Sequence, residues 1–207
     1  MTIPGLGLIL AVLLNDFEGW QRFAVYAVCA MLLLCETQFK LREPFGFGGW
    51  FEPSVKDATI VSSLPELRGL LLPPGTVDLV DSTIRIVREN TTSADTIFTY
   101  PEFGFFYGAT ERMAATFSAA QNIDVVSDSV AKHEAEELLR ARPAVVIYGR
   151  MPEHWLQWQE WFWRGGKRSG QRDVIAAIET LTREYRLVQT FSSDGLGHPV
   201  YIYVRPK

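Results

Sequence analysis

The sequence predicts an α/β fold: a three-layer sandwich with a mostly parallel central sheet and an antiparallel C-terminal edge hairpin, preceded by one or two N-terminal apolar helices that could cross a membrane. Three observations carry this prediction. Helical and strand-like hydrophobic patterns alternate along residues 54–207, which favours parallel strands joined by right-handed crossovers. Two strand-like segments close the chain around a turn-rich connector, which predicts a hairpin. The first quarter of the chain, in contrast, is almost uncharged and mostly apolar.

This first quarter contains two apolar stretches, residues 3–14 and the unbroken run 23–35. A spanning helix needs roughly 20 mostly apolar residues, so flanking residues must extend the second run, and we predict a membrane span over residues 20–39. A secretory signal peptide is one alternative, but residues 1–14 carry no Lys or Arg. A buried helix of a soluble domain is another, but the run has no polar stripe.

A change of composition marks the boundary of the globular part. Residues 41–53 are dense in Gly, Pro and aromatic residues, which is typical of a linker next to a membrane. We therefore divide the chain into membrane segments 1–40, a juxtamembrane linker 41–53 and a globular α/β domain 54–207.

Three helices are predicted in the domain, and they begin near Thr76, Ser127 and Gln171. Thr76 is expected to be the N-cap of the first helix, after a Pro-Pro-Gly sequence that ends the preceding segment. Ser127 or the next residue is expected to cap the second helix. In that helix Glu134 is expected on a solvent-facing side, together with neighbouring charged residues.

Four strands are predicted from β-branched and aromatic runs bounded by turn residues: Thr96–Tyr100 and residues 144–148, 186–191 and 200–204. The second run is apolar throughout, as expected for a strand that is covered on both faces. The last two are separated by a connector rich in Ser, Asp, Gly and Pro, which predicts an antiparallel hairpin.

Charge and motifs exclude several classes of function. Lys and Arg number 20 against 24 Asp and Glu, a net charge of -4, so no nucleic-acid partner is predicted. The sequence has no nucleotide-binding glycine motif, no P-loop, no H-E-x-x-H and no G-x-S-x-G. No metal and no cofactor is predicted, because both cysteines lie in the apolar run and the three histidines are not spaced as ligands.

A candidate ligand site lies at the carboxyl ends of two neighbouring predicted strands, where open sheets collect ligands. The candidate residues are Tyr100, Glu102, Tyr107, Arg112, Tyr148 and Arg150. Aromatic faces and a guanidinium suit a sugar or a lipid phosphate. The alternative is that these aromatic residues fill the end of the core and that Arg112 pairs with Glu111 or Glu102.

A second candidate site is a tryptophan-rich segment followed by cations, which is typical of a membrane interface. Its residues are Trp155, Trp158, Trp161, Trp163, Arg164, Lys167 and Arg168. We expect the indoles to face a bilayer and the cations, with Arg172, to attract anionic lipid. The alternative is core packing of aromatic residues at helical spacing.

The order of these segments resembles the C-terminal extracytoplasmic domain of polytopic C-type glycosyltransferases. Residues 64–90, 96–117, 131–149 and 184–206, after an apolar span and an aromatic linker, carry the resemblance. They are similar to the dolichyl-phosphate-mannose protein mannosyltransferases and the lipid A aminoarabinose transferases, which take sugar from a polyprenyl-phosphate donor. The resemblance implies a membrane-anchored domain that positions an acceptor or stabilises the membrane part.

The same resemblance implies no catalytic residue in this chain, because the family's catalytic acidic residues lie in an early extracytoplasmic loop that has no counterpart here. The implied partners are the lipid bilayer and a polyprenyl-phosphate sugar or glycan acceptor. A self-standing membrane-tethered binding or interaction module is the alternative. Lys40 and Arg42 after the span favour a cytoplasmic domain by charge, whereas the resemblance implies an extracytoplasmic domain, which we expect.

Overall fold

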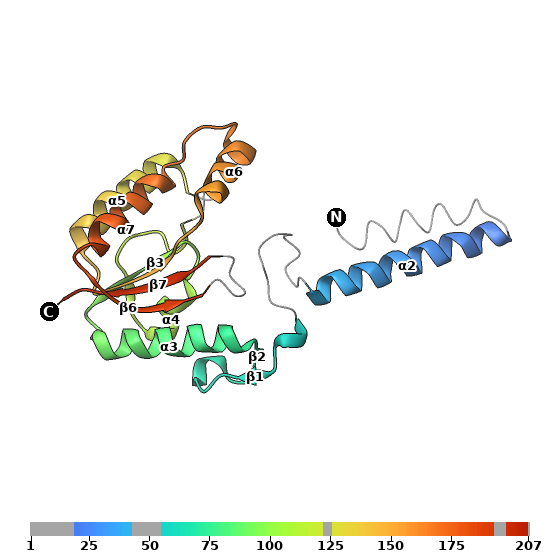
Figure 1. The fold of residues 1–207 in the computed structure, drawn as a ribbon, viewed down its shortest axis with the longest axis horizontal. Helices are drawn as coiled ribbons and strands as arrows, with labels where there is room; N and C mark the ends of the chain where they lie inside the picture. The colour runs from blue at the N-terminus through green and yellow to red at the C-terminus, as the bar shows by residue number, and fades with distance from the viewer. Residues whose placement is uncertain (1–18, 43–54, 122–125, 193–197, 207) are drawn as a thin grey trace. The chain divides into compact units, whose positions relative to one another are not determined.

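A computed structural model describes residues 19–42, 55–121, 126–192 and 198–206 (Figure 1). The chain divides into two units, Met1–Lys56 and Asp57–Lys207. The predicted apolar stretch at residues 3–14 and most of the predicted linker lie outside the described residues.

The first unit contains one long apolar helix, α2 (Trp20–Arg42), which extends the predicted span to 23 residues. At 1.5 Å per residue it is about 34 Å long, enough for the hydrocarbon core of a bilayer. Its mean hydropathy is 1.4 and none of its residues is buried. Within the described residues it is the one helix that is long and apolar enough to cross a membrane, and a signal sequence would meet the same criteria.

The second unit is a mixed α/β domain built on a five-stranded sheet with the strand order β4-β3-β5-β7-β6. The strands are β3 (Thr96–Tyr100), β4 (Met113–Ala114), β5 (Val145–Gly149), β6 (Arg186–Phe191) and β7 (Val200–Val204). β3 is parallel to both β4 and β5, whereas β7 lies between β5 and β6 and is antiparallel to both. The sheet is therefore mixed, and the predicted antiparallel hairpin forms one edge of it.

A second, two-stranded antiparallel sheet precedes the main sheet in the chain. It pairs β1 (Ile60–Val61) with β2 (Leu71–Leu72), and the short 3-10 helices η1 (Val55–Asp57) and η2 (Pro65–Leu67) lie before and between these strands. The connection is fixed to the following helix by Asp81, which accepts hydrogen bonds from the hydroxyls of Ser62 at 2.6 Å and Ser63 at 2.8 Å.

Five helices complete the described part of the domain: α3 (Pro74–Asn90), α4 (Phe105–Thr110), α5 (Asp128–Ala141), α6 (Glu153–Arg164) and α7 (Gln171–Thr182). Ser127 is the N-cap of α5, as predicted, and its hydroxyl accepts a hydrogen bond from the Val130 amide. The prediction that Thr76 caps α3 is wrong, because α3 begins two residues earlier with Pro73 as N-cap. Proline suits the first helical position, which needs no amide donor, so the two prolines begin the helix rather than only ending the preceding segment.

The core lies on both faces of the main sheet, because successive strand residues point to opposite faces. In β5, Val145 and Ile147 join a cluster with α3 and α4, whereas Val146 and Tyr148 join a cluster with α5 and α7. Figure 1 shows α5 and α7 side by side, and these two helices share the second cluster.

The expectation that Glu134 on α5 faces solvent is wrong, because its side chain is buried. It accepts hydrogen bonds from the Ser118 amide at 3.1 Å and from Nε2 of Gln121 at 3.0 Å. The position lies one turn from the buried residues Ala131 and Leu138, so helical geometry carries it into the inner face. Glu134 therefore holds the segment after β4 against the domain.

Candidate functional site

The predicted ligand residues Tyr100 and Tyr148 lie side by side at the carboxyl ends of the neighbouring strands β3 and β5. They are paired in register across β3 and β5, and their ring centroids are 5.9 Å apart. Tyr148 is paired in turn with Tyr201 of β7, at 6.5 Å between ring centroids. Burial raises the pKa of the Tyr100 and Tyr148 hydroxyls, so both are neutral at physiological pH. Three strands thus contribute one row of tyrosines, which the sequence could not show without the register.

Tyr203 adds a fourth ring, 6.2 Å from that of Tyr201, and both side chains are half-buried. Neither was among the predicted site residues. The pattern Val-Tyr-Ile-Tyr-Val contains the signal, since residues two apart in a strand share one face. We call Tyr100, Tyr148, Tyr201 and Tyr203 the tyrosine row.

Tyr107 and Arg112, also predicted for the ligand site, make structural contacts instead of joining the tyrosine row. The Tyr107 hydroxyl accepts a hydrogen bond from the Thr99 amide at 3.1 Å, and burial raises its pKa. Arg112 donates to the hydroxyl of Thr91 and to the carbonyl of Thr110, each at 2.9 Å. Arg112 therefore ties the end of α3 to the end of α4. Its contact with Glu111 is to the main-chain carbonyl, at 3.3 Å.

The last two predicted ligand residues, Glu102 and Arg150, are exposed. The Arg150 amide donates to the Pro199 carbonyl at 3.0 Å, which fixes its backbone beside β7. The Glu179 carboxylate raises the pKa of the Tyr148 and Tyr203 hydroxyls, and the Arg150 guanidinium lowers it. Opposite charges therefore lie near the tyrosine row. Ligand binding at these residues stays a prediction.

A hollow lies elsewhere, beside α3. Its volume is about 500 Å³, and Asp81, Arg85 and Glu89 are among its lining residues. None of the predicted site residues lines it. Since Asp81 is engaged by the hydroxyls of Ser62 and Ser63, this hollow belongs to the contact between α3 and the two-stranded sheet.

The tryptophan-rich segment forms α6, which follows β5 after three residues. The helix buries Leu156, Gln159 and Glu160. Trp155 is half-buried, whereas Trp158, Trp161, Phe162 and Trp163 are all more than half exposed. Core packing of this segment thus accounts for Trp155 but not for the other indoles.

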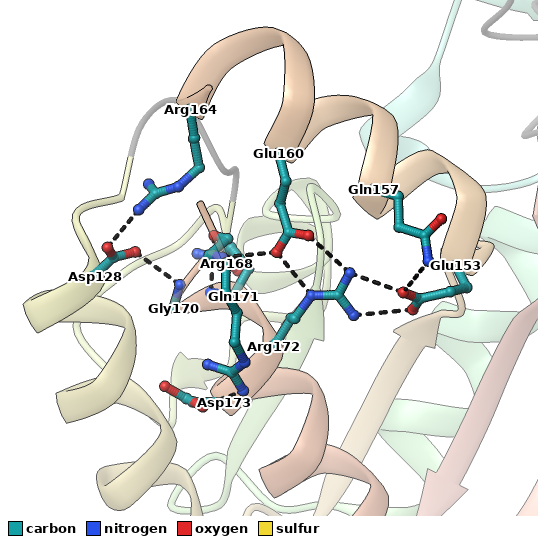
Figure 2. A network of polar contacts seen from close by, with 11 residues as sticks. Asp128, Glu153, Gln157, Glu160, Arg164, Arg168, Gly170, Gln171, Arg172 and Asp173 are labelled. Carbon is teal, nitrogen blue, oxygen red and sulfur yellow. Dashed lines mark hydrogen bonds and ion pairs between the residues drawn. The ribbon is translucent and has the colours of Figure 1, made fainter. Parts of the chain in front are cut away.

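A network of ion pairs fixes the inner face of α6 to the start of α7 (Figure 2). Arg172 donates to both carboxylate oxygens of Glu160, at 2.7 and 2.9 Å, and to both oxygens of Glu153, at 3.0 and 2.8 Å. Glu160 also accepts the Ser169 amide at 2.7 Å. The guanidinium holds the pKa of Glu160 and of Glu153 below its usual range, and the two carboxylates raise the pKa of Arg172. Bidentate pairs of this kind are the strongest that guanidinium makes.

Asp128, the first residue of α5, extends the network to a third helix (Figure 2). One of its carboxylate oxygens accepts the Gly170 amide at 2.7 Å, and the other is paired with Arg164 at the end of α6. The Gly170 amide, followed by Arg164, lowers the pKa of Asp128. α5, α6 and α7 therefore meet at one polar junction.

Most of the cations after the tryptophans form ion pairs within the domain, and their attraction of anionic lipid stays a prediction. Of the four cations after the tryptophans, Arg164 is paired with Asp128, Arg168 with Asp173, and Arg172 with Glu153 and Glu160. Within the described residues no carboxylate is paired with Lys167. Three of these cations thus pair with four carboxylates, and with Lys167 the formal charges of the eight residues sum to zero. The carboxylates that pair with these arginines lie up to 36 positions away in sequence, so the local run of cations does not reveal them.

In the part of the chain that the structure describes, no three His, Cys, Asp or Glu side chains gather in a way that could hold a metal ion. Comparisons with protein-family models, with curated proteins and with solved structures found no match for this chain.

Proposed function

We propose that this chain is the membrane-anchored extracytoplasmic α/β domain of a glycosyltransferase-like membrane protein, in which α2 spans the bilayer. The domain, a three-layer sandwich in this proposal, positions a glycan acceptor or stabilises the membrane part. It does not transfer sugar by itself, because the catalytic acidic residues of the family that it resembles have no counterpart among the residues that carry the resemblance.

The observation that carries the proposal is α2. Its 23 residues have a mean hydropathy of 1.4, and the helix buries none of them against the rest of the chain. An isolated apolar helix in water would expose Phe23, Leu33 and Leu34, each more than 60% exposed, at a large cost in hydration free energy. A bilayer removes that cost.

Two further observations support the finer parts of the proposal. Core residues of the main sheet alternate between a cluster with α3 and α4 and a cluster with α5 and α7, as a sandwich requires. The half-buried rings of Tyr201 and Tyr203, with charged groups nearby, provide stacking surfaces of the kind that sugar rings use.

The anchor is tested by placing charge in the middle of α2. Met31 and Leu34 are exposed there, at 58% and 66%. Each arginine at the centre of a spanning helix costs roughly 3 kcal/mol, so Met31→Arg/Leu34→Arg should release the chain from membranes in alkaline carbonate. The matched control is Met113→Arg/Phe117→Arg, at exposed positions of the α/β unit, which should stay with the membrane pellet, as should the unaltered chain. Release of the unaltered chain, or its cleavage after α2, would overturn the proposal.

The orientation is tested separately, by adding protease to sealed spheroplasts. The proposal expects digestion of the α/β unit from outside. A unit that stays intact until the membrane is permeabilised would instead be cytoplasmic, as the charges of Lys40 and Arg42 favour.

The alternative is a self-standing membrane-tethered binding module. One observation favours it: the exposed aromatic side of α6 could bind a partner without any contribution from a transferase. The gene context distinguishes the two functions. An adjoining reading frame that encodes many apolar segments and an early acidic loop supports the transferase, and its absence supports the module.

A further inference from the structure

α6 presents an aromatic surface to solvent. We call it the α6 aromatic face and define it by four side chains with their exposed fractions: Trp158 at 53%, Trp161 at 67%, Phe162 at 53% and Trp163 at 58%. Single exposed apolar residues are ordinary on proteins, whereas neighbouring ones mark a contact surface. The grouping of these side chains therefore indicates a contact surface.

The rings of the face are in contact with one another through Phe162. The Trp158 ring stacks on it at 5.2 Å with an interplanar angle of 14°, and the Trp163 ring meets it edge-on at 4.6 Å and 84°. The Trp161 ring lies 6.4 Å away. Because these rings already restrict one another, little side-chain entropy remains to be lost on binding.

The side of α6 opposite this face is held to α7 by ion pairs. Arg172 holds α6 at its first residue, Glu153, and about two turns later at Glu160, which fixes the direction in which the aromatic side faces (Figure 2). The formal charges of Arg164, Lys167, Arg168 and Arg172 equal in number those of Asp128, Glu153, Glu160 and Asp173, so these residues together add no net charge. A polyanionic partner would gain little here.

We propose that the α6 aromatic face inserts into the headgroup layer of a zwitterionic bilayer. Indole combines an apolar body with an N–H donor, and tryptophan is enriched at the boundary between headgroups and acyl chains for that reason. A helix with one aromatic side and one charged side fits the plane of that boundary. The inference rests on one part of the proposed function, namely that α2 anchors the chain in a bilayer.

Tryptophan fluorescence of the full chain tests the inference. The chain has six tryptophans, so Trp20→Phe/Trp50→Phe leaves a reporter whose four indoles all lie in α6. The reporter is reconstituted in phosphatidylcholine vesicles with brominated acyl chains. An interfacial helix lies roughly 5–10 Å into the headgroup and acyl boundary, so bromine near the carboxyl end of the chains should quench more than bromine near their middle, and aqueous iodide should quench little.

The matched control keeps the aromatic area and removes the reporting indoles. Trp158→Phe/Trp161→Phe/Trp163→Phe in the reporter leaves the half-buried Trp155 alone, and bromolipid should quench it at least about twofold less than the reporter, because it lies deeper in the domain. Quenching of the reporter should stay the same when phosphatidylglycerol is added, and between ~0.1 M and ~1 M salt, since screening has no net charge to act on.

Each other outcome overturns the inference. Indoles that iodide quenches and bromolipid does not would be in water. Indoles that neither quenches would be covered by protein, a second copy or another partner. Quenching that rises with anionic lipid and falls with salt would mean that the cations, not the neutral aromatic face, make the contact.

The failure of this inference can be told apart from the failure of the proposed function. Carbonate extraction reports on α2 alone, whereas bromolipid quenching reports on α6 alone. If α2 does not anchor the chain, co-flotation of the added chain with neutral vesicles still tests α6, and Met31→Arg/Leu34→Arg should then float as the unaltered chain does.

Discussion

Arg172 is the side chain on which the attachment of α6 depends. It lies in the first turn of α7 and makes four hydrogen bonds with two glutamates about two turns apart on α6. Arg172→Met keeps an unbranched apolar stem and removes the guanidinium, with its charge and its donors. We expect this one substitution to lower the stability of the domain by more than any exposed ion pair can account for.

The magnitude follows from the exposure of the two partners. The Glu160 side chain is 10% exposed and would keep only the Ser169 amide as a donor, whereas the Glu153 side chain is 59% exposed and can return to water. Breaking a buried pair costs about 3–5 kcal/mol and an exposed one about 0–1 kcal/mol. Since the edge of Glu160 is within reach of water, we expect a loss of roughly 2–4 kcal/mol, or about 5–15 °C in Tm for a domain of this size.

The pH dependence gives a second, independent readout. The pKa of Glu160 in the folded protein lies below its ordinary value of 4.5, so the pair contributes stability that is present above that value and is lost as pH falls through the folded pKa. The difference in Tm between the unaltered chain and Arg172→Met should therefore be largest near neutral pH and shrink in acid. Calorimetry of the full chain in detergent from about pH 7 to pH 3 measures both quantities.

Arg168→Met is the matched control for this prediction. Arg168 pairs with Asp173 at 2.7 Å, but the two side chains are 60% and 39% exposed, so its loss should cost less than about 1 kcal/mol. If Arg172→Met were no more destabilising than Arg168→Met, or if its effect were the same at every pH, the argument for a buried clamp would be wrong.

Two further substitutions test the packing around the same helices. Gly170→Ala should cost about 1–3 kcal/mol in thermal unfolding, because a Cβ there would lie 2.8 Å from Cα and 2.9 Å from the carbonyl oxygen of Asp128, which are backbone atoms that cannot move aside; an unchanged Tm would contradict the close contact of α5 with α7. Tyr185→Phe removes the buried hydrogen bond from the Tyr185 hydroxyl to the Pro143 carbonyl, 2.8 Å long, and should cost about 1–3 kcal/mol; a neutral result would mean that water reaches the carbonyl.

The sequence predicted the longer strands of the main sheet well, for a physical reason. Thr96–Tyr100 matches β3, and the other three predicted runs match β5, β6 and β7 within a residue. Each is a β-branched or aromatic run ended by proline, glycine or a turn, and burial of such a run is decided locally. β4 has two residues and is defined by its pairing with β3 alone, so no local pattern could reveal it.

Contacts between distant segments account for what the sequence did not predict. The tyrosine row exists because Tyr148 is in register with both Tyr100 and Tyr201, and register depends on how strands are paired. The polar junction of α5, α6 and α7 exists because Asp128 and the glutamates of α6 pair with arginines that are distant in sequence. Residues 164–172 alone do not reveal these pairs. Local patterns thus predicted the strands, but not the register between strands or the ion pairs between helices.

α6 explains why periodicity alone could not decide between core packing and an exposed surface. An ordinary amphipathic helix buries its apolar side, and its aromatic residues at helical spacing were compatible with that arrangement. In α6 Gln159 and Glu160 are turned inward beside Leu156, whereas the indoles of Trp158, Trp161 and Trp163 are exposed. This is possible because Arg172 satisfies the buried carboxylate of Glu160, and a satisfied carboxylate can occupy a position that otherwise needs an apolar residue. Attachment and aromatic contact are thereby assigned to opposite sides of one helix, so that the aromatic side is left free of any role in holding the domain together.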